Sequence, residues 1–213
     1  MSAPLALVAC VAIGYLCGSL PWGLWLGRVF KGVDVRTLGS GNLGATNVYR
    51  SLGRGIGVAT LVLDIAKGAL PVWLVPATRL GAAFPGGAAW CAIAVGFAAV
   101  AGHVWTFLAG FKGGKGVATT VGVLLALSPP AFGVFVAVFL LTLLATRYVS
   151  LGSILGSLAF TAALARFSAG GVRSPAFLLG VLLATLVVVR HRENIGRLVR
   201  GEEHRFSFSR SKS

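Results

Sequence analysis

The sequence predicts an all-α integral membrane protein with seven transmembrane helices, its N-terminus outside and its C-terminus in the cytoplasm. Hydrophobic residues make up 56% of the 213 residues and charged residues only 11%, which is more apolar than a soluble domain. The apolar residues also gather in runs, and a bilayer span needs about 20 helical residues. We expect spans at about residues 4–27, 56–78, 87–110, 117–127, 131–146, 149–166 and 174–190.

The first span, residues 4–27, has no ionisable group except tyrosine and cysteine. No Lys or Arg precedes it, and its apolar run is longer than that of a signal peptide, so we expect a transmembrane helix. The cysteines Cys10, Cys17 and Cys91 all lie in apolar segments without the spacing of a metal site. We expect them to be small buried packing residues.

The fourth span, residues 117–127, is the shortest. Its 11 residues, at a rise of about 1.5 Å each, cover about half of the hydrocarbon thickness. Ser128-Pro129-Pro130 ends it, because a residue before proline avoids the α region and proline has no N–H to donate. Whether this span crosses the bilayer fully is open. If residues 117–146 were one helix, every later span would change sides.

The positions of the charges decide between these two topologies. A net charge of +14 also suits nucleic-acid binding, but the basic residues lie in short loops between apolar runs. Seven spans put 15 of the 19 Lys and Arg on one side and three on the other, with Lys67 inside a span. This bias predicts that the basic loops are cytoplasmic, and we expect no nucleic-acid partner. The fifteen are Arg28, Lys31, Arg36, Arg50, Arg54, Lys112, Lys115, Arg147, Arg190, Arg192, Arg197, Arg200, Arg205, Arg210 and Lys212.

We expect a single membrane domain over residues 1–213, in which residues 205–213 form a basic tail. The sequence shows no internal repeat and no linker to a second domain. Its polar, glycine-rich segments all fall on the expected cytoplasmic face. They are residues 39–54, 111–116, 147–150 and 190–203.

The first loop, GSGNLG at residues 39–44, fits the dinucleotide fingerprint G-x-G-x-x-G, and Asp64 follows 20 residues after Gly44, as a ribose-binding acid would. That interpretation needs a preceding strand in a parallel sheet, but an apolar span and a charged turn precede this loop. The loop still suits a phosphate. Glycines let backbone N–H groups converge, Ser40 and Asn42 add donors, and a helix beginning near Gly44 adds its N-terminal N–H groups.

The residues after the first loop predict a short helix at the membrane interface. At 3.6 residues per turn, one stripe of this helix is apolar and the other is polar. The polar stripe consists of Thr46, Asn47, Arg50 and Arg54.

The second loop, FKGGKG at residues 111–116, is only loosely similar to a P-loop. Ala109 stands where that motif requires glycine, and Gly116 where it requires Ser or Thr, which argues against an ATPase. Lys112 and Lys115 on a glycine-rich backbone can still hold phosphate oxygens. Alternatively, one of the two lysines only fixes the topology.

The third motif, RHRENIGR at residues 190–197, follows the last span. On a continuing helix His191 and Asn194 are neighbours. Histidine exchanges a proton most readily near neutral pH, so His191 is a candidate base. The alternative is a histidine that only makes hydrogen bonds at the interface.

Asp64, Lys67 and His103 lie in the interior of predicted spans. Asp64 and Lys67 are one turn apart, and because an isolated charge in a membrane is costly we expect a structural ion pair. We expect His103 to be a polar packing residue. The three histidines and five acidic residues are scattered, so we predict no metal site and no cofactor. The sequence also has no Gly-x-Ser-x-Gly elbow.

Several segments together resemble the bacterial acyl-phosphate:glycerol-3-phosphate acyltransferases. The first loop with residues 45–47, the second loop, and residues 190–195 with Gly201-Glu202 resemble the three signature motifs of that family. Leu43 stands where the family often has proline, and Trp105-Thr106 where Phe-Pro is common, which affects loop stiffness more than any donor. Residues 18–23, 63–68 and 147–153 are also similar, in the same order, so the resemblance covers nearly the whole chain.

The resemblance implies a seven-span inner-membrane enzyme with its motifs on the cytoplasmic side. Such an enzyme moves a fatty acyl group from acyl phosphate to the 1-hydroxyl of sn-glycerol 3-phosphate and releases lysophosphatidic acid and inorganic phosphate. This is the first acylation of bacterial phospholipid synthesis. We expect acyl phosphate, glycerol 3-phosphate and membrane lipid as partners, and function as a monomer.

A membrane transporter of a phosphorylated metabolite is the alternative function. Intramembrane charges and broken helices suit transport. The sequence lacks an inverted repeat, however, and its polar motifs gather on one side rather than at the midplane. Both observations favour the acyltransferase.

On the acyltransferase interpretation, Ser40, Asn42 and Lys115 hold the acyl phosphate, and either His191 or a substrate phosphate, with a second pKa of about 6, accepts the proton. These four residues are the expected catalytic group, and Asp64 and Lys67 are structural. The expected substrate-binding residues are Gly41, Thr46, Asn47, Arg50, Lys112, Gly113, Gly114, Ser150, Asn194 and Glu202.

Overall fold

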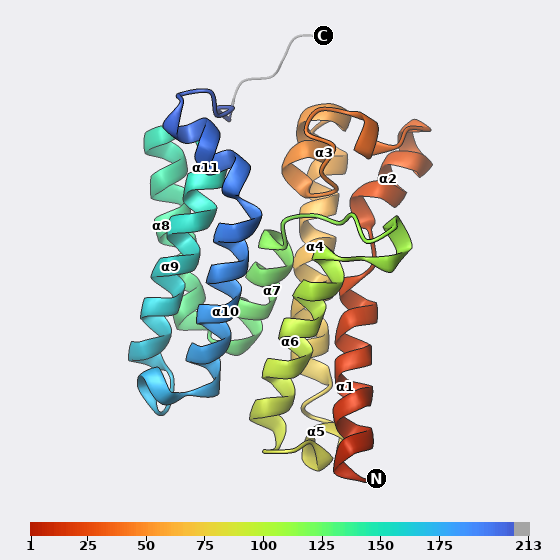
Figure 1. Ribbon diagram of the computed structural model, residues 1–213, viewed down its shortest axis with the longest axis vertical. Helices are drawn as coiled ribbons and strands as arrows, with labels where there is room; N and C mark the ends of the chain where they lie inside the picture. The colour runs from red at the N-terminus through yellow and green to blue at the C-terminus, as the bar shows by residue number, and fades with distance from the viewer. Residues whose placement is uncertain (207–213) are drawn as a thin grey trace. The chain divides into compact units, whose positions relative to one another are not determined.

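The protein, seen here in a computed structural model that describes residues 1–206, consists of helices joined by short loops (Figure 1). No strand occurs in residues 1–206, which confirms the all-α prediction. Within that range five stretches are long and apolar enough to cross a membrane, and six if the bent pair at the C-terminal end counts as one. Seven spans and the sides of the termini stay predictions. Beyond Phe206, the expected basic tail lies outside the described residues.

Two compact units make up the chain, and each is described by itself. The N-terminal unit is Met1–Leu127 and the C-terminal unit is Ser128–Ser213. At the start of the second unit, Ser128 has non-helical backbone and two prolines follow it, as the sequence predicts. Residues 117–146 are therefore not one helix.

The N-terminal unit contains seven α-helices and two 3-10 helices. The expected first span, residues 4–27, is broken at Ser19–Pro21, because Pro21 lacks the N–H that would continue the helix. The elements are α1 (Ala3–Gly18), α2 (Trp22–Lys31), η1 (Val35–Thr37), α3 (Ala45–Leu52), α4 (Arg54–Leu74), α5 (Arg79–Ala83), α6 (Ala88–Val104), η2 (Phe107–Ala109) and α7 (Val117–Leu127).

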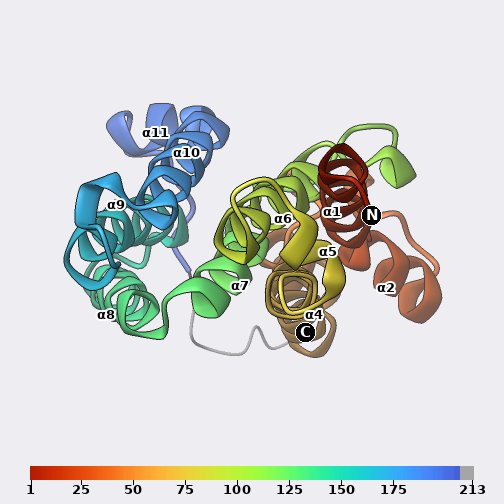
Figure 2. The same ribbon diagram turned by 90° about the horizontal axis from the view of Figure 1, so that it is seen from below.

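Small residues let the long helices of this unit approach closely, as is usual in membranes. Helices α1, α4 and α6 pack side by side (Figure 2). A Cβ at Gly68 of α4 would lie 2.2 Å from the carbonyl oxygen of Thr119 on α7, and one at Gly18 of α1 would lie 1.9 Å from that of Ala99 on α6. Cys10 and Cys91 are buried free thiols facing each other between α1 and α6, in agreement with the packing role expected of them.

A small apolar core fixes the first loop between α2 and α3. Buried Leu24 of α2, Leu43 of the loop and Val48 of α3 belong to it. Gly23 permits the close approach, since a Cβ there would lie 2.2 Å from the carbonyl oxygen of Leu43. The start of α2 therefore sets the position of the first loop.

The C-terminal unit is a helical hairpin followed by a bent helix pair. Its elements are α8 (Pro129–Thr146), α9 (Val149–Phe167), η3 (Gly171–Arg173), α10 (Pro175–Arg190) and α11 (Arg192–Val199). The expected continuing helix after the last span is wrong, because α11 departs from the axis of α10 by 58°. The bend falls at His191, whose φ and ψ of −102° and 10° end the first helix.

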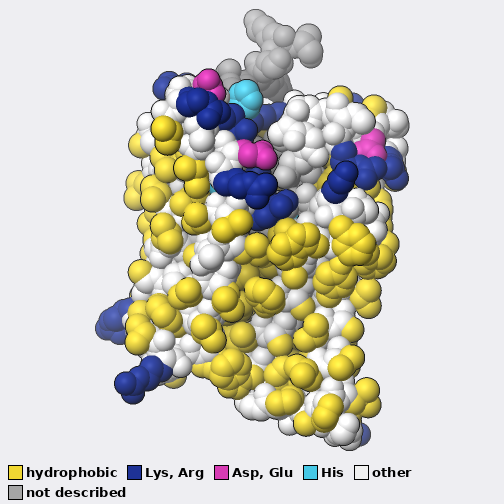
Figure 3. All heavy atoms as spheres, viewed as in Figure 1, with side chains coloured by type: hydrophobic (Ala, Val, Ile, Leu, Met, Phe, Trp, Pro, Cys, Tyr) yellow, Lys and Arg dark blue, Asp and Glu magenta, His cyan; other side chains and the backbone are white. Residues whose placement is uncertain are grey.

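The surface of each unit matches a membrane environment. Apolar side chains such as Leu141 and Leu144 of α8, and Val62 of α4, are more than half exposed, as lipid-facing residues are. Figure 3 shows one face, on which Lys and Arg gather at the α2–α3 end of the N-terminal unit and, in the C-terminal unit, at the α11 end with a few at the opposite end.

Candidate active site

An aspartate organises the chain that enters the first loop. Asp34 caps η1 by accepting a hydrogen bond from the backbone N–H of Arg36, and its carboxylate also binds the guanidinium groups of Arg36 and Arg28 at 2.6 and 2.9 Å. Hydrogen bonds from Arg36 hold the pKa of the Asp34 carboxyl well below its usual range. Asp34 is therefore charged at neutral pH and keeps both arginines beside the loop.

The first loop turns several of its N–H groups inward. Gly39 and Gly41 have φ of 56° and 67°, which glycine adopts readily. The N–H of Ser40 donates to Asn47 Oδ1, that of Gly41 to the carbonyl of Leu38, and that of Gly44 to Asn42 Oδ1. These three N–H groups are therefore engaged within the protein, and the expected convergence of loop N–H groups on an anion does not include them as donors in this geometry. The Ser40 hydroxyl and the Asn42 amide nitrogen stay predicted donors to a ligand.

Asn47 is the residue that fixes the shape of this loop. It is 6% exposed, and its amide nitrogen donates to the carbonyls of Leu38 and Asn42 at 3.1 and 2.9 Å. Its oxygen accepts from the N–H of Ser40 at 3.0 Å. Asn47, expected to touch substrate, instead lies under the loop, because its amide matches the loop's own donors and acceptors.

The second loop is anchored on the end of α6. The N–H groups of Gly113 and Gly114 donate to the carbonyls of Val104 and His103 at 3.1 and 3.2 Å. A Cβ at Gly113 would lie 1.9 Å from the His103 carbonyl oxygen, and one at Gly114 would lie 2.0 Å from His103 Nε2. Both glycines are therefore needed for close contact with α6, and their N–H groups are engaged by α6 carbonyls in this structure.

Lys112 is exposed and Lys115 is half-buried just before α7 begins. Thr46 and Arg50 lie on α3, half-buried and exposed respectively. Two of these four side chains belong to the second loop, and two belong to the helix that follows the first loop. They remain the predicted phosphate ligands of the N-terminal unit.

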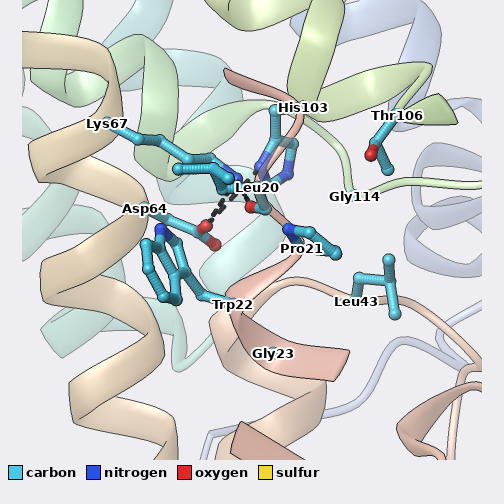
Figure 4. A pocket seen from close by; sticks show the side chains of 10 residues that line it. All are labelled: Leu20, Pro21, Trp22, Gly23, Leu43, Asp64, Lys67, His103, Thr106 and Gly114. Carbon is cyan, nitrogen blue, oxygen red and sulfur yellow. Dashed lines mark hydrogen bonds and ion pairs between the residues drawn. The ribbon is translucent and has the colours of Figure 1, made fainter. Parts of the chain in front are cut away.

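A small pocket lies between the two loops (Figure 4). Leu43 of the first loop and Gly114 of the second both line it, so the fold brings the two predicted phosphate-binding loops together. Trp22 Nε1 is buried on its wall and makes no hydrogen bond within residues 1–206. The full lining is Leu20, Pro21, Trp22, Gly23, Leu43, Asp64, Lys67, His103, Thr106 and Gly114.

The floor of this pocket is ionic. Lys67 Nζ lies 2.8 Å from Asp64 Oδ1, so the expected ion pair is present, and it also donates to the carbonyl oxygen of Leu20 at 2.7 Å. His103 Nδ1 lies 3.7 Å from the same Asp64 oxygen. In Figure 4 the three side chains point toward one another from α4 and α6. The sequence predicts the pairing of Asp64 with Lys67. It does not predict that His103, which lies on another helix, approaches the same carboxylate.

In the C-terminal unit a single carboxylate gathers the polar residues. Glu203 accepts hydrogen bonds from Ser150 Oγ, Asn194 Nδ2 and Arg197 Nε at 2.8, 2.6 and 2.8 Å. Burial would raise the pKa of Glu203, but the hydrogen bonds from Asn194, Arg197 and Ser150 outweigh it and bring the pKa below its ordinary value. Glu203 thus joins α9, α11 and the segment after α11.

Sequence reasoning chose the neighbouring Glu202 and missed Glu203. The Glu202 side chain is 59% exposed and pairs with Arg200, whereas the Glu203 side chain is 7% exposed. The only sequence signal was the pair of adjacent glutamates. A turn at Gly201, with φ of 72°, decides which of the two points inward.

His191 lies buried at the bend between α10 and α11. Its Nδ1 is 2.8 Å from the carbonyl oxygen of Val187. Because a carbonyl only accepts hydrogen bonds, Nδ1 carries the hydrogen, and in the neutral ring Nε2 is then the nitrogen that can take up a proton.

The apolar helices and their polar loops define a multi-pass, all-helical integral membrane protein. Residues 8–201 match the family described as glycerol-3-phosphate acyltransferase. The chain is 50% identical over 196 residues to the glycerol-3-phosphate acyltransferase of Geobacter sulfurreducens, covering 92% of this chain and 95% of that one. It is 48% identical to that of Anaeromyxobacter dehalogenans, covering 95% and 98%. The chain belongs to the glycerol-3-phosphate acyltransferase family.

Two crystal structures of PlsY (YgiH), described as an integral membrane glycerol 3-phosphate acyltransferase, have the same fold. The glycerol 3-phosphate form matches with a TM-score of 0.82 and 37% identity, covering 94% of this chain and 96% of that one. The lysophosphatidic acid form matches with a TM-score of 0.79 and 38% identity, covering 94% and 95%.

Proposed function

We propose that this protein transfers a fatty acyl group from acyl phosphate to the 1-hydroxyl of sn-glycerol 3-phosphate, releasing lysophosphatidic acid and inorganic phosphate. The observation that carries the proposal is the match, at 37% identity over 94% of the chain, to a PlsY structure in its glycerol 3-phosphate form. The two glycine-rich loops of the N-terminal unit support it, because Leu43 of the first loop and Gly114 of the second line the same pocket.

In the proposed reaction the 1-hydroxyl oxygen attacks the carbonyl carbon of acyl phosphate. The carbon–oxygen bond to phosphate breaks, and phosphate leaves with the electron pair. We assign Ser40, Asn42 and Lys115 to the acyl phosphate, since a lysine and neutral donors stabilise the charge that develops on the leaving group. Phosphate is a good leaving group, so orientation and charge stabilisation suffice without a covalent intermediate.

We assign the phosphate of glycerol 3-phosphate to Thr46, Arg50 and Lys112. An arginine can bind two phosphate oxygens at once, and all three side chains lie in the second loop or on the helix after the first loop. Gly41, Gly113 and Gly114 contribute by shaping the loops. The sequence predicts Glu202 as a substrate ligand. We propose that the neighbouring Glu203 contributes instead, by holding the predicted ligands Ser150 and Asn194.

The proton of the 1-hydroxyl passes either to His191 or to a substrate phosphate. The tautomer set by Val187 supports His191 Nε2 as an acceptor, while a phosphate with a second pKa of about 6 can take the proton itself. We further propose that the enzyme acts as a monomer in the bacterial inner membrane, with its loops on the cytoplasmic side.

Turnover by the purified protein tests this function. The protein in detergent micelles receives glycerol 3-phosphate with palmitoyl phosphate, palmitoyl-CoA or palmitoyl acyl carrier protein. We expect lysophosphatidic acid and phosphate in equal amounts with palmitoyl phosphate alone, and severe loss of both in Lys115→Ala. Product formed only with palmitoyl-CoA would contradict the proposal that acyl phosphate is the acyl donor. No product from any donor would overturn the activity, as expected of a transporter.

A further inference from the structure

We propose that Asp64, Lys67 and His103 form a positioning group that sets the geometry of both glycine-rich loops at once. Lys67 contacts the segment before α2, His103 contacts the second loop, and Asp64 lies between the two side chains. The effect of this group on KM rests on the proposed function, whereas its effect on the geometry of the loops does not.

Lys67 holds the break between α1 and α2. The position of α2 in turn sets that of the first loop. At the break the N–H of Leu24 donates to the carbonyl of Pro21 and not to that of Leu20. The Leu20 carbonyl oxygen accepts instead from the N–H of Trp22 at 3.1 Å and from Lys67 Nζ at 2.7 Å. Gly23, one residue into α2, then packs against the Leu43 carbonyl of the first loop. The Lys67 ammonium group is thus connected to the first loop through the Leu20 carbonyl and the start of α2.

Asp64 and His103 extend the same group to the second loop. Asp64 Oδ1 lies 2.8 Å from Lys67 Nζ and 3.7 Å from His103 Nδ1. The other ring nitrogen of His103 lies directly against Gly114, and the His103 carbonyl accepts the N–H of Gly114. One carboxylate on α4 therefore connects the supports of both loops.

The burial of the group argues for a role beyond stability. Asp64, Lys67 and His103 are 2, 6 and 5% exposed. Buried ion pairs are often no more stabilising than apolar residues of the same size, although breaking one by removing a single partner is costly. A double replacement therefore removes the group without leaving an unpaired charge, which separates positioning from folding.

Amide hydrogen exchange of the protein in detergent tests the positioning without any substrate. In Asp64→Asn/Lys67→Met we expect exchange at least about tenfold faster in peptides spanning the first loop (residues 39–44) and the second loop (residues 111–116), as loss of hydrogen bonds to a charged group implies. Thr60→Val is the matched control. Thr60 is buried on the same helix and bonds only to its own helix at Ile56, so both loops should exchange as in the wild type.

His103→Leu gives a second, selective measurement and keeps the ion pair. We expect faster exchange in the second loop alone, with the first loop unchanged, and partial recovery in His103→Gln, whose amide can replace the ring nitrogens. This variant also decides the matter if the double variant fails to fold. Wild-type exchange of both loops in a folded double variant, or of the second loop in His103→Leu, would overturn the proposal.

Kinetics then link the loops to turnover. In the folded double variant we expect KM for both substrates to rise about tenfold or more while the melting temperature stays near that of Thr60→Val. Wild-type KM values would show that the pair is only structural and overturn the positioning role. If the wild-type protein itself transfers no acyl group, the proposed function fails, and the exchange measurements still decide the positioning.

Discussion

Asn194 donates a 2.6 Å hydrogen bond to Glu203, and this bond ties α11 to the segment that follows it. The same carboxylate accepts from Ser150 on α9. Asn194 and Ser150 are both predicted substrate ligands, so Glu203 decides where two of them lie. Because Glu203 accepts hydrogen bonds from three side chains at once, it fixes their positions relative to one another.

Glu203→Ala should therefore destabilise the protein by about 2–3 kcal/mol, because it leaves buried donors without their acceptor. Activity should fall with it. Glu202→Ala is the matched control, since Glu202 is exposed and pairs only with Arg200, and its effect should stay within about 0.5 kcal/mol. Thermal unfolding of both variants in one detergent measures the difference. Equal melting temperatures for the two would contradict the role given to Glu203.

The stability contributed by Glu203 should depend on pH. Its pKa is lowered in the folded protein, so its contribution is fully present above the unfolded pKa of about 4.3 and is lost as the pH falls through the lower folded pKa. The gap in melting temperature between the wild type and Glu203→Gln should be constant from pH 7 to about 5 and shrink below about pH 4. A gap that widens toward acid would show the opposite sign.

Asn47→Ala should lower stability even without substrate. The amide of Asn47 bonds to the backbone at Leu38, Ser40 and Asn42, and its loss should cost about 2–3 kcal/mol. It should also reduce kcat/KM by about a hundredfold as the loop loses its shape. The control is Ser51→Ala, because Ser51 has only a 3.5 Å contact with Asn47. An Asn47→Ala protein with wild-type stability and a raised KM would mark Asn47 as a substrate ligand instead.

The fold was predictable where it depends on local sequence. Apolar runs identify the long helices, and the prolines at 129 and 130 mark the boundary between the units. The break at Pro21 was missed because the run around it is apolar on both sides, although proline itself was the signal. The inward turn of Asn47 was also missed, since an amide beside a glycine-rich loop serves the loop or a ligand equally well.

Contacts between distant segments were beyond the sequence for a different reason. The pairing of Asp64 with Lys67 follows from helical spacing, whereas His103 joins them only because α4 and α6 pack together. Glu203 differs from Glu202 only by the turn at Gly201. Which atoms of the loop residues face inward depends on hydrogen bonds that composition does not reveal.

Gly114→Ala should impair the protein through a steric conflict with His103. The new Cβ would lie 2.0 Å from His103 Nε2, so the ring must move and the second loop with it. We expect kcat/KM to fall at least about tenfold, whereas adding Gly114→Ala to His103→Ala should cause little further loss, because the ring that the new Cβ meets is gone. Gly133→Ala is the control, since a Cβ there has no neighbour within 4 Å among the described residues and favours the helix. A double variant that is as much worse than His103→Ala as Gly114→Ala is worse than the wild type would contradict the steric explanation.

His191→Ala should separate the two candidates for the base. If His191 Nε2 takes the proton, its removal lowers kcat by about 10²–10⁴ with little change in KM. If a substrate phosphate takes the proton, the buried ring serves only to hold the bend against Val187, and the variant should show lower stability and a raised KM with kcat nearly unchanged.

His204→Ala provides the same substitution at an exposed histidine and should leave stability, KM and kcat as in the wild type. Because the orientation of Nδ1 toward a carbonyl leaves Nε2 as the basic nitrogen, we expect the first outcome, measured as separate kcat and KM values for glycerol 3-phosphate at saturating acyl phosphate.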